Sequence, residues 1–65
     1  MKQYAIRYDT DKNAWRHGLY ASLESAIKDA ALHARSLWGR AVGVYICEWD
    51  GNEYGRRLWD SRGGA

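Results

Sequence analysis

The sequence predicts a two-layer α+β fold of order ββαββ, in which one helix covers a four-stranded, mostly antiparallel sheet. Two observations predict it. Short runs of alternating or β-branched apolar residues occur in pairs on both sides of the middle of the chain, and the middle carries apolar residues at helical spacing. The 65 residues form a single small domain, which buries only about 60% of the surface exposed by its unfolded chain.

The first strand pair is expected before residue 21. Residues 3–9, QYAIRYD, place an aromatic or aliphatic side chain at every second position, as in a half-buried strand. The polar run at 9–13 has short side chains that hydrogen-bond locally in turns. Residues 14–20 then complete a hairpin, with Gly18 marking a bulge or a close backbone approach.

A helix is expected from residue 23 to about residue 38. Ser22 can cap its first N–H groups, and Glu24 favours the positive end of its dipole. Gly39 is expected to end it. Leu32 projects to the polar side, so it is either an ordinary exposed leucine or a contact with a partner. The apolar face, rich in alanine, consists of Leu23, Ala26, Ile27, Ala30, Ala34, Leu37 and Trp38.

The second strand pair is expected at residues 41–49, AVGVYICEW, and 53–59, EYGRRLW, with residues 60–65 as a frayed tail. Both faces of its first strand are apolar, and the pattern leaves open which face packs on the helix. One helix covers only one face of the sheet. We therefore expect large apolar side chains on the uncovered face, where contiguous exposed apolar patches usually mark contacts.

The turn at residues 50–52 allows two hairpin registers. A turn centred on its last two residues places Trp49 opposite Tyr54, whereas one centred on its first two residues places Glu48 opposite Glu53. Like charges directly opposite each other are unfavourable. The first register, or a bulged three-residue loop, is therefore preferred.

Composition and motifs exclude several classes of function. Cys47 is the only cysteine, which fits a reducing compartment, and there is neither a signal-like segment nor a run that could span a membrane. We expect a cytoplasmic protein without a membrane partner. His17 and His33 lack the spacing of a metal site, and no nucleophile, base and acid stand in a catalytic pattern. We therefore predict no enzyme activity, no metal and no cofactor.

Arginines interleaved with aromatic residues are the strongest remaining signal. Such a cationic rim suits single-stranded nucleic acid, and it suits a protein interface equally well. A third interpretation places the aromatic residues in the core, with arginines along the sheet edge. Acidic residues at the hairpin tip would repel phosphates, which favours a protein partner. The predicted partner-binding residues are Arg56, Arg57, Trp59, Tyr54, Trp49, Arg40 and Leu32.

The opening KQYAIRY, the helix entry YASLESAIKDA and the closing RRLWD form a recognisable layout. In this layout, the chain resembles short phage-encoded ββαββ proteins, including some anti-CRISPR proteins. The resemblance covers nearly the whole chain. AP2-type DNA-binding domains have a similar aromatic-x-Ser-x-x-x-Ala junction but place three strands before the helix. The resemblance implies a protein that occupies a surface of a host-defence complex stoichiometrically. It carries over no functional residue, because it rests on no shared motif.

The sequence thus predicts a small non-catalytic binding protein of phage or mobile-element origin that masks a surface on a host protein or nucleoprotein complex. The alternatives are a module that binds single-stranded nucleic acid through the aromatic and arginine-bearing sheet face, and a self-associating module. In the second alternative, the uncovered sheet face would be buried in a homodimer.

Overall fold

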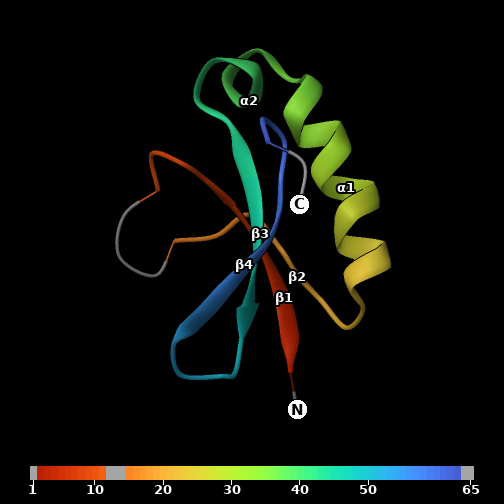
Figure 1. Cartoon of the computed structure of the whole chain (residues 1–65), viewed down its shortest axis with the longest axis vertical. Coiled ribbons are helices and arrows are strands. Elements are labelled where there is room, and N and C mark those ends of the chain that lie inside the picture. Colours follow the sequence, from red (N-terminus) through yellow and green to blue (C-terminus); the bar gives the residue numbers. More distant parts are fainter. Residues whose placement is uncertain (1, 12–14, 64–65) are drawn as a thin grey trace.

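A computed structural model describes residues 2–11 and 15–63 of the chain. Within these residues a four-stranded sheet has the order β2-β1-β3-β4, and each neighbouring pair is antiparallel. The helix α1 lies along one side of the sheet, and α2 lies at the end where β3 begins (Figure 1). The expected two-layer α+β fold is confirmed. The elements are β1 (Gln3–Tyr8), β2 (Leu19–Tyr20), α1 (Leu23–Arg35), α2 (Leu37–Val42), β3 (Val44–Trp49) and β4 (Tyr54–Asp60).

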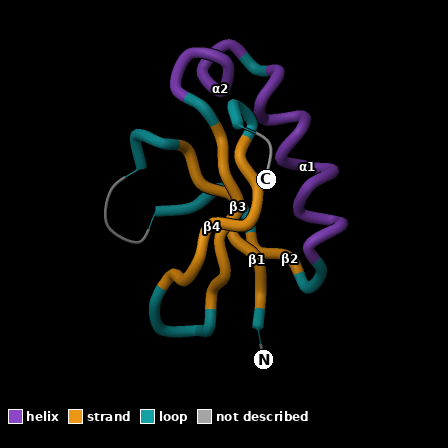
Figure 2. Tube along the Cα trace, in the orientation of Figure 1, coloured by secondary structure: helices purple, strands orange, loops and turns teal. Residues whose placement is uncertain are grey.

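The core lies between α1 and the two central strands, β1 and β3 (Figure 2). Ala26 and Ala30 are fully buried and present only methyl groups, so the helix can lie close to the sheet. The face of β3 that carries Val44 and Ile46 therefore packs on the helix, which settles the choice that the sequence left open. The buried cluster consists of Ile6, Tyr8, Ala26, Ala30, Val44 and Ile46.

The end of the long helix differs from the prediction. The Ser22 cap is present, since the Oγ of Ser22 accepts a hydrogen bond from the N–H of Ser25 at 3.2 Å. However, α1 ends at Arg35 and not near residue 38, because Ser36 is extended, with φ −67° and ψ 160°. The Oγ of Ser36 donates to the carbonyl of His33 at 2.6 Å and accepts from the N–H of Gly39 at 3.0 Å. One hydroxyl thus ends α1 and begins α2.

Gly39 was expected to stop a helix, but it lies inside α2. A Cβ at Gly39 would collide with the carbonyl of His33, so the glycine allows α2 to fold back against the end of α1. The helical turn continues to Val42 and ends at Gly43, whose φ of 89° suits glycine. Residues 41–42 are therefore helical, and β3 begins later than the predicted strand.

The second expected strand is shorter than predicted. Only Leu19 and Tyr20 form β2, although the N–H of His17 donates to the carbonyl of Ile6 at 2.8 Å and continues the pairing. The start of the predicted strand, Ala14, lies outside the described residues, as does part of the expected turn. The short β2 leaves the outer edge of β1 only partly paired.

The β3–β4 hairpin has the preferred register at its tip, where Trp49 pairs with Tyr54. Two irregularities then shift the register along the strands. The predicted tail began too early, because Asp60 belongs to β4 and Ser61 bonds twice with Val44. The N–H of Ser61 donates to the Val44 carbonyl at 2.9 Å, and its Oγ accepts from the Val44 N–H at 3.0 Å. Residues 64–65 lie outside the described part of the chain.

Candidate interaction surfaces

The sheet face opposite α1 is not the wet apolar surface expected from the sequence. Its three large rings are only partly exposed, and the central Cys47 is 2% exposed. A guanidinium group lies over each ring, which shields the ring from water while forming a cation–π contact. We call this surface the arginine-covered face. Its stacked pairs are Arg57 on Tyr45 at 3.7 Å, Arg7 on Tyr54 at 4.2 Å and Arg16 on Trp49 at 5.0 Å, measured to the ring centroids.

Polar contacts fix two of these arginines in place. Arg7 is 9% exposed and its Nε donates to the carbonyl of Trp15 at 2.9 Å. The two terminal nitrogens of Arg57 reach Asp9 at 3.1 Å and Asp60 at 2.8 Å. Hydrogen bonds from the Arg62 N–H and from Arg57 hold the pKa of Asp60 below its ordinary value. The arginine-covered face is therefore a pre-ordered surface.

Burial also raises the pKa of the Cys47 thiol, which lies beneath these side chains. A raised pKa keeps the sulfur protonated at neutral pH, and the thiol is a poor nucleophile in that state. Cys47 is thus a small buried residue of the sheet, as its position on a central strand suggested.

Large exposed apolar side chains occur instead where α1 meets α2. Leu37 is 81% exposed, Leu32 62% and Trp38 58%. We call these three residues the apolar corner. Leu37 and Trp38 were predicted to face the core, and they leave it because the break at Ser36 ends the regular turn of α1. A hollow of about 320 Å³, lined by Asp29, Leu32, His33 and Ser36, lies beside the corner.

Two exposed arginines flank the apolar corner. Arg35 is the last residue of α1, and Arg40 lies within α2. In the described part of the chain, neither guanidinium has a carboxylate within ion-pair distance. The corner is therefore apolar, with these two arginines next to it along the chain and the Asp29 carboxylate in the hollow beside it.

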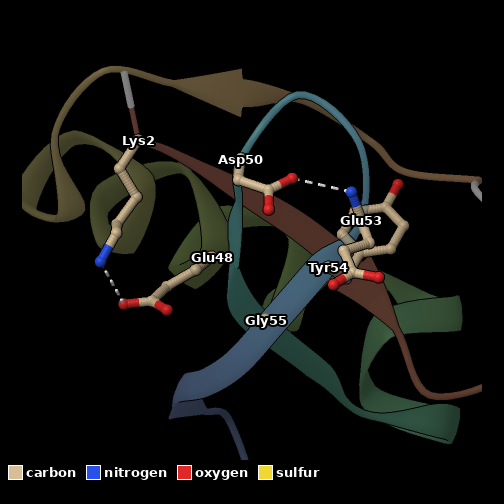
Figure 3. Close-up of a pocket in the computed structure, with 6 residues that line it drawn as sticks. All are labelled: Lys2, Glu48, Asp50, Glu53, Tyr54 and Gly55. Atoms are coloured by element: carbon tan, nitrogen blue, oxygen red, sulfur yellow. Dashed lines mark hydrogen bonds and ion pairs between the residues drawn. The ribbon is translucent and has the colours of Figure 1, made fainter.

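The hairpin tip has the opposite charge. Glu48, Asp50 and Glu53 line a small hollow of about 160 Å³ together with Lys2, which forms an ion pair with Glu48 at 3.4 Å (Figure 3). The N–H groups of Glu53 and Asn52 each donate to Asp50 Oδ1 at 2.8 Å and lower the pKa of this carboxyl. The Asp50 carboxylate thus stabilises the turn. Among the described residues, no three ligating side chains are placed to hold a metal ion.

A fourth feature, a cluster of aromatic and imidazole rings, was not predicted from the sequence. The ring of His17 lies 4.2 Å from that of Tyr8 and 5.8 Å from that of His33, measured between centroids. Tyr8 Oη lies 3.0 Å from His33 Nδ1, which links α1 to β1. The histidines are sixteen positions apart on different segments, so only the packing of α1 on the sheet brings them together.

The predicted partner-binding residues divide between separate places. Leu32 and Arg40 belong to the α1–α2 region, whereas Trp49, Tyr54 and Arg57 share the arginine-covered face. The remaining two predicted residues, Arg56 and Trp59, belong to neither of these two groups. Arg56 is exposed, and its guanidinium forms no ion pair within residues 2–11 and 15–63. Trp59 pairs with Ile46 and packs against the core on the helix side.

Comparisons with protein-family models, with curated proteins and with solved structures found no match. No helix in the described ranges is both long and apolar enough to cross a membrane. The function is therefore argued from the surfaces themselves.

Proposed function

We propose that this chain is a small non-catalytic binding protein and that the apolar corner is its main contact surface. The exposure of Leu37 and Trp38, adjacent in a short helix, carries the proposal. A domain of this size has little apolar area to bury, so exposing two large apolar side chains forgoes stabilisation that a partner would restore. Contiguous exposed apolar patches mark contact sites, and tryptophan and arginine are the side chains that most often dominate interface energy.

The charges around the corner define the chemistry of the partner. Arg35 and Arg40 at its rim favour an apolar partner surface edged by carboxylates. A symmetric contact between two copies of the corner would bring together two surfaces that each carry these arginines, which is unfavourable. A different protein with an acidic rim is therefore the preferred partner, ahead of a homodimer.

Single-stranded nucleic acid remains the second candidate partner. Sheet-face readers stack bases on exposed aromatic rings. Here Tyr45, Trp49 and Tyr54 are each covered by a guanidinium, so a base would first have to displace an arginine. This cost supports the protein partner over nucleic acid.

The layout resemblance to small phage proteins extends the proposal to the biological setting. In this setting, the chain acts stoichiometrically inside the cell, where it masks a protein surface on a host-defence nucleoprotein complex. Occupation of a surface requires no catalytic group, and a compact domain with one apolar contact patch suits that role.

Affinity capture from the native host tests the proposal with a matched pair of tryptophan variants. Trp38→Ser removes the aromatic side chain of the corner, and Trp15→Ser removes a tryptophan of similar exposure, 63%, on the segment before β2. We expect recovery of the partner to fall at least about tenfold for Trp38→Ser and to stay unchanged for Trp15→Ser. Equal recovery for both variants would exclude the corner as the contact surface. Loss of the bound material on nuclease treatment would favour nucleic acid.

A further inference from the structure

The outer edge of β4 is a second surface, and its backbone groups can pair with another strand. β4 is the last strand of the sheet, and β3 is the only element that it contacts extensively among the described residues. It is seven residues long, whereas the strand at the other edge, β2, has two. An unpaired edge presents backbone N–H and C=O groups that can pair with another strand. β4 is therefore the longer of the two edges, although two irregularities in its pairing with β3 interrupt it.

The middle of this edge is open to solvent. Gly55, Arg56 and Arg57 are three consecutive exposed residues. A Cβ at Gly55 would meet the Oε1 of Glu48 at 3.1 Å and its Cβ at 3.3 Å, so contact with β3 favours glycine there. The same glycine leaves the edge backbone bare, and an incoming backbone can approach it closely.

The charges along β4 act against pairing with a second copy. From the tip the strand carries Glu53 just before its start, then Arg56 and Arg57 at its centre and Asp60 at its end. Full antiparallel self-pairing would place Arg56 of one copy opposite Arg57 of the other, and Glu53 opposite Asp60. In-register parallel pairing would place each charge opposite itself. Like charges directly opposite each other destabilise a strand pair.

From this pattern we infer that the outer edge of β4 binds an extended segment of a partner protein by strand addition. The segment carries an acidic residue opposite Arg56 and a basic residue opposite Glu53, because Arg57 and Asp60 already pair with each other at 2.8 Å. Backbone hydrogen bonds supply affinity in this mode of recognition, and side chains supply specificity. The site is independent of the apolar corner and does not rest on the function proposed for it.

Arg56 is expected to select the charge of the bound segment. The guanidinium of Arg57 already holds Asp9 and Asp60, at 3.1 and 2.8 Å. Arg56 is exposed and holds no carboxylate in the described ranges, so its donors are available for a bidentate contact. Reversal of its charge should therefore strongly reduce the charge preference of the edge.

Three synthetic peptides of eight residues test the inference on the intact protein. The first is Lys-Thr-Val-Glu-Glu-Val-Thr-Lys, the second has every charge reversed, and the third is the first peptide with alternate backbone nitrogens methylated. Binding is followed by amide chemical shifts in nuclear magnetic resonance. We expect the first peptide to bind at least about tenfold more tightly than the second, with shifts centred on β4. We expect the methylated peptide not to bind, because it lacks the N–H donors.

Two arginine variants provide the matched control. Arg56→Glu should strongly reduce the preference between the first two peptides, whereas Arg40→Glu, an exposed arginine outside the strand, should leave it unchanged. An unchanged unfolding midpoint shows that each variant is folded. The inference is overturned if neither peptide binds at millimolar concentration, if both bind equally, or if the methylated peptide binds as well as the first. It is also overturned if sedimentation shows a dimer whose β4 amides are protected from exchange.

Discussion

Replacement of Leu37 by alanine should change stability very little, and the structure sets the magnitude. The side chain is 81% exposed, so 100 − 81 = 19% of its surface is covered. Complete burial of a leucine side chain stabilises a protein by about 1.5–3 kcal/mol, so loss of this fraction costs about 0.3–0.6 kcal/mol. If α1 continued unbroken to residue 38, Leu37 would lie on its buried face, and the same change would cost about 2–5 kcal/mol.

Equilibrium unfolding in urea separates these two values. The free energy of unfolding is extrapolated linearly to water for the wild type and for Leu37→Ala. Ile46→Ala is the positive control, because Ile46 is fully buried and its truncation should cost about 2–5 kcal/mol. A loss of 2 kcal/mol or more for Leu37→Ala would refute the break at Ser36 and the apolar corner derived from it.

Three further changes test the junctions of the fold. Ser36→Ala removes the hydroxyl that ends α1 and begins α2, and urea unfolding should show a loss of about 1 kcal/mol; no change would mean that the hydroxyl bonds are not needed. Gly43→Ala should cost about 1 kcal/mol or more in the same assay, because φ is 89° and the new Cβ would meet Asp9 and Arg62 at 3.1 Å. The hydrogen bond to Asp29, at 2.7 Å, raises the pKa of Tyr20 from 10.0 to about 12. The neutral phenol is thus favoured in the folded state, so its contribution to stability is complete below pH 10 and is lost as the pH rises to about 12. Tyr20→Phe should remove that part of the pH dependence, and an unaltered profile would contradict the assignment.

Local patterns predicted most of the fold. The alternation in β1, the β-branched run of β3 and the Ser22 cap each depend on residues close together in sequence, and all three are present in the structure. The tip register was predictable as well, because the repulsion between Glu48 and Glu53 disfavoured the competing turn.

The end of α1 was not predictable from periodicity alone. Leu37 and Trp38 continue the apolar stripe of the helix, and the pattern contains no residue that forbids a further turn. The break depends on the Ser36 hydroxyl bonding two backbone groups and on Gly39 fitting against the His33 carbonyl. These contacts form only when α2 folds back, so helical propensity did not reveal them.

The predicted binding residues illustrate the same limit. The sequence grouped Trp59 with Trp49 and Tyr54 as binding residues, but alternation along β4 puts Trp59 on the helix side, where it pairs with Ile46. The register shifts instead bring Arg57 opposite Cys47, onto the arginine-covered face. The sequence also predicted solvent-exposed rings on the face that the helix does not cover. In the structure, Arg7 covers the Tyr54 ring and Arg16 covers the Trp49 ring, and both arginines come from segments far away in the sequence. Such contacts join residues that are far apart in the sequence, so neither helical nor strand periodicity predicts them.

The sequence by itself determined the order of the four strands and the long helix, the α+β class and the absence of any motif with catalytic or metal-binding spacing. These properties follow from local periodicity, from capping chemistry and from residue types. Only the tertiary structure decided which face of β3 is buried, which rings the arginines cover, and that Leu37 and Trp38 are exposed beside Arg40. The physical reason is that burial and charge pairing depend on contacts between residues far apart in the chain, and folding alone establishes those contacts.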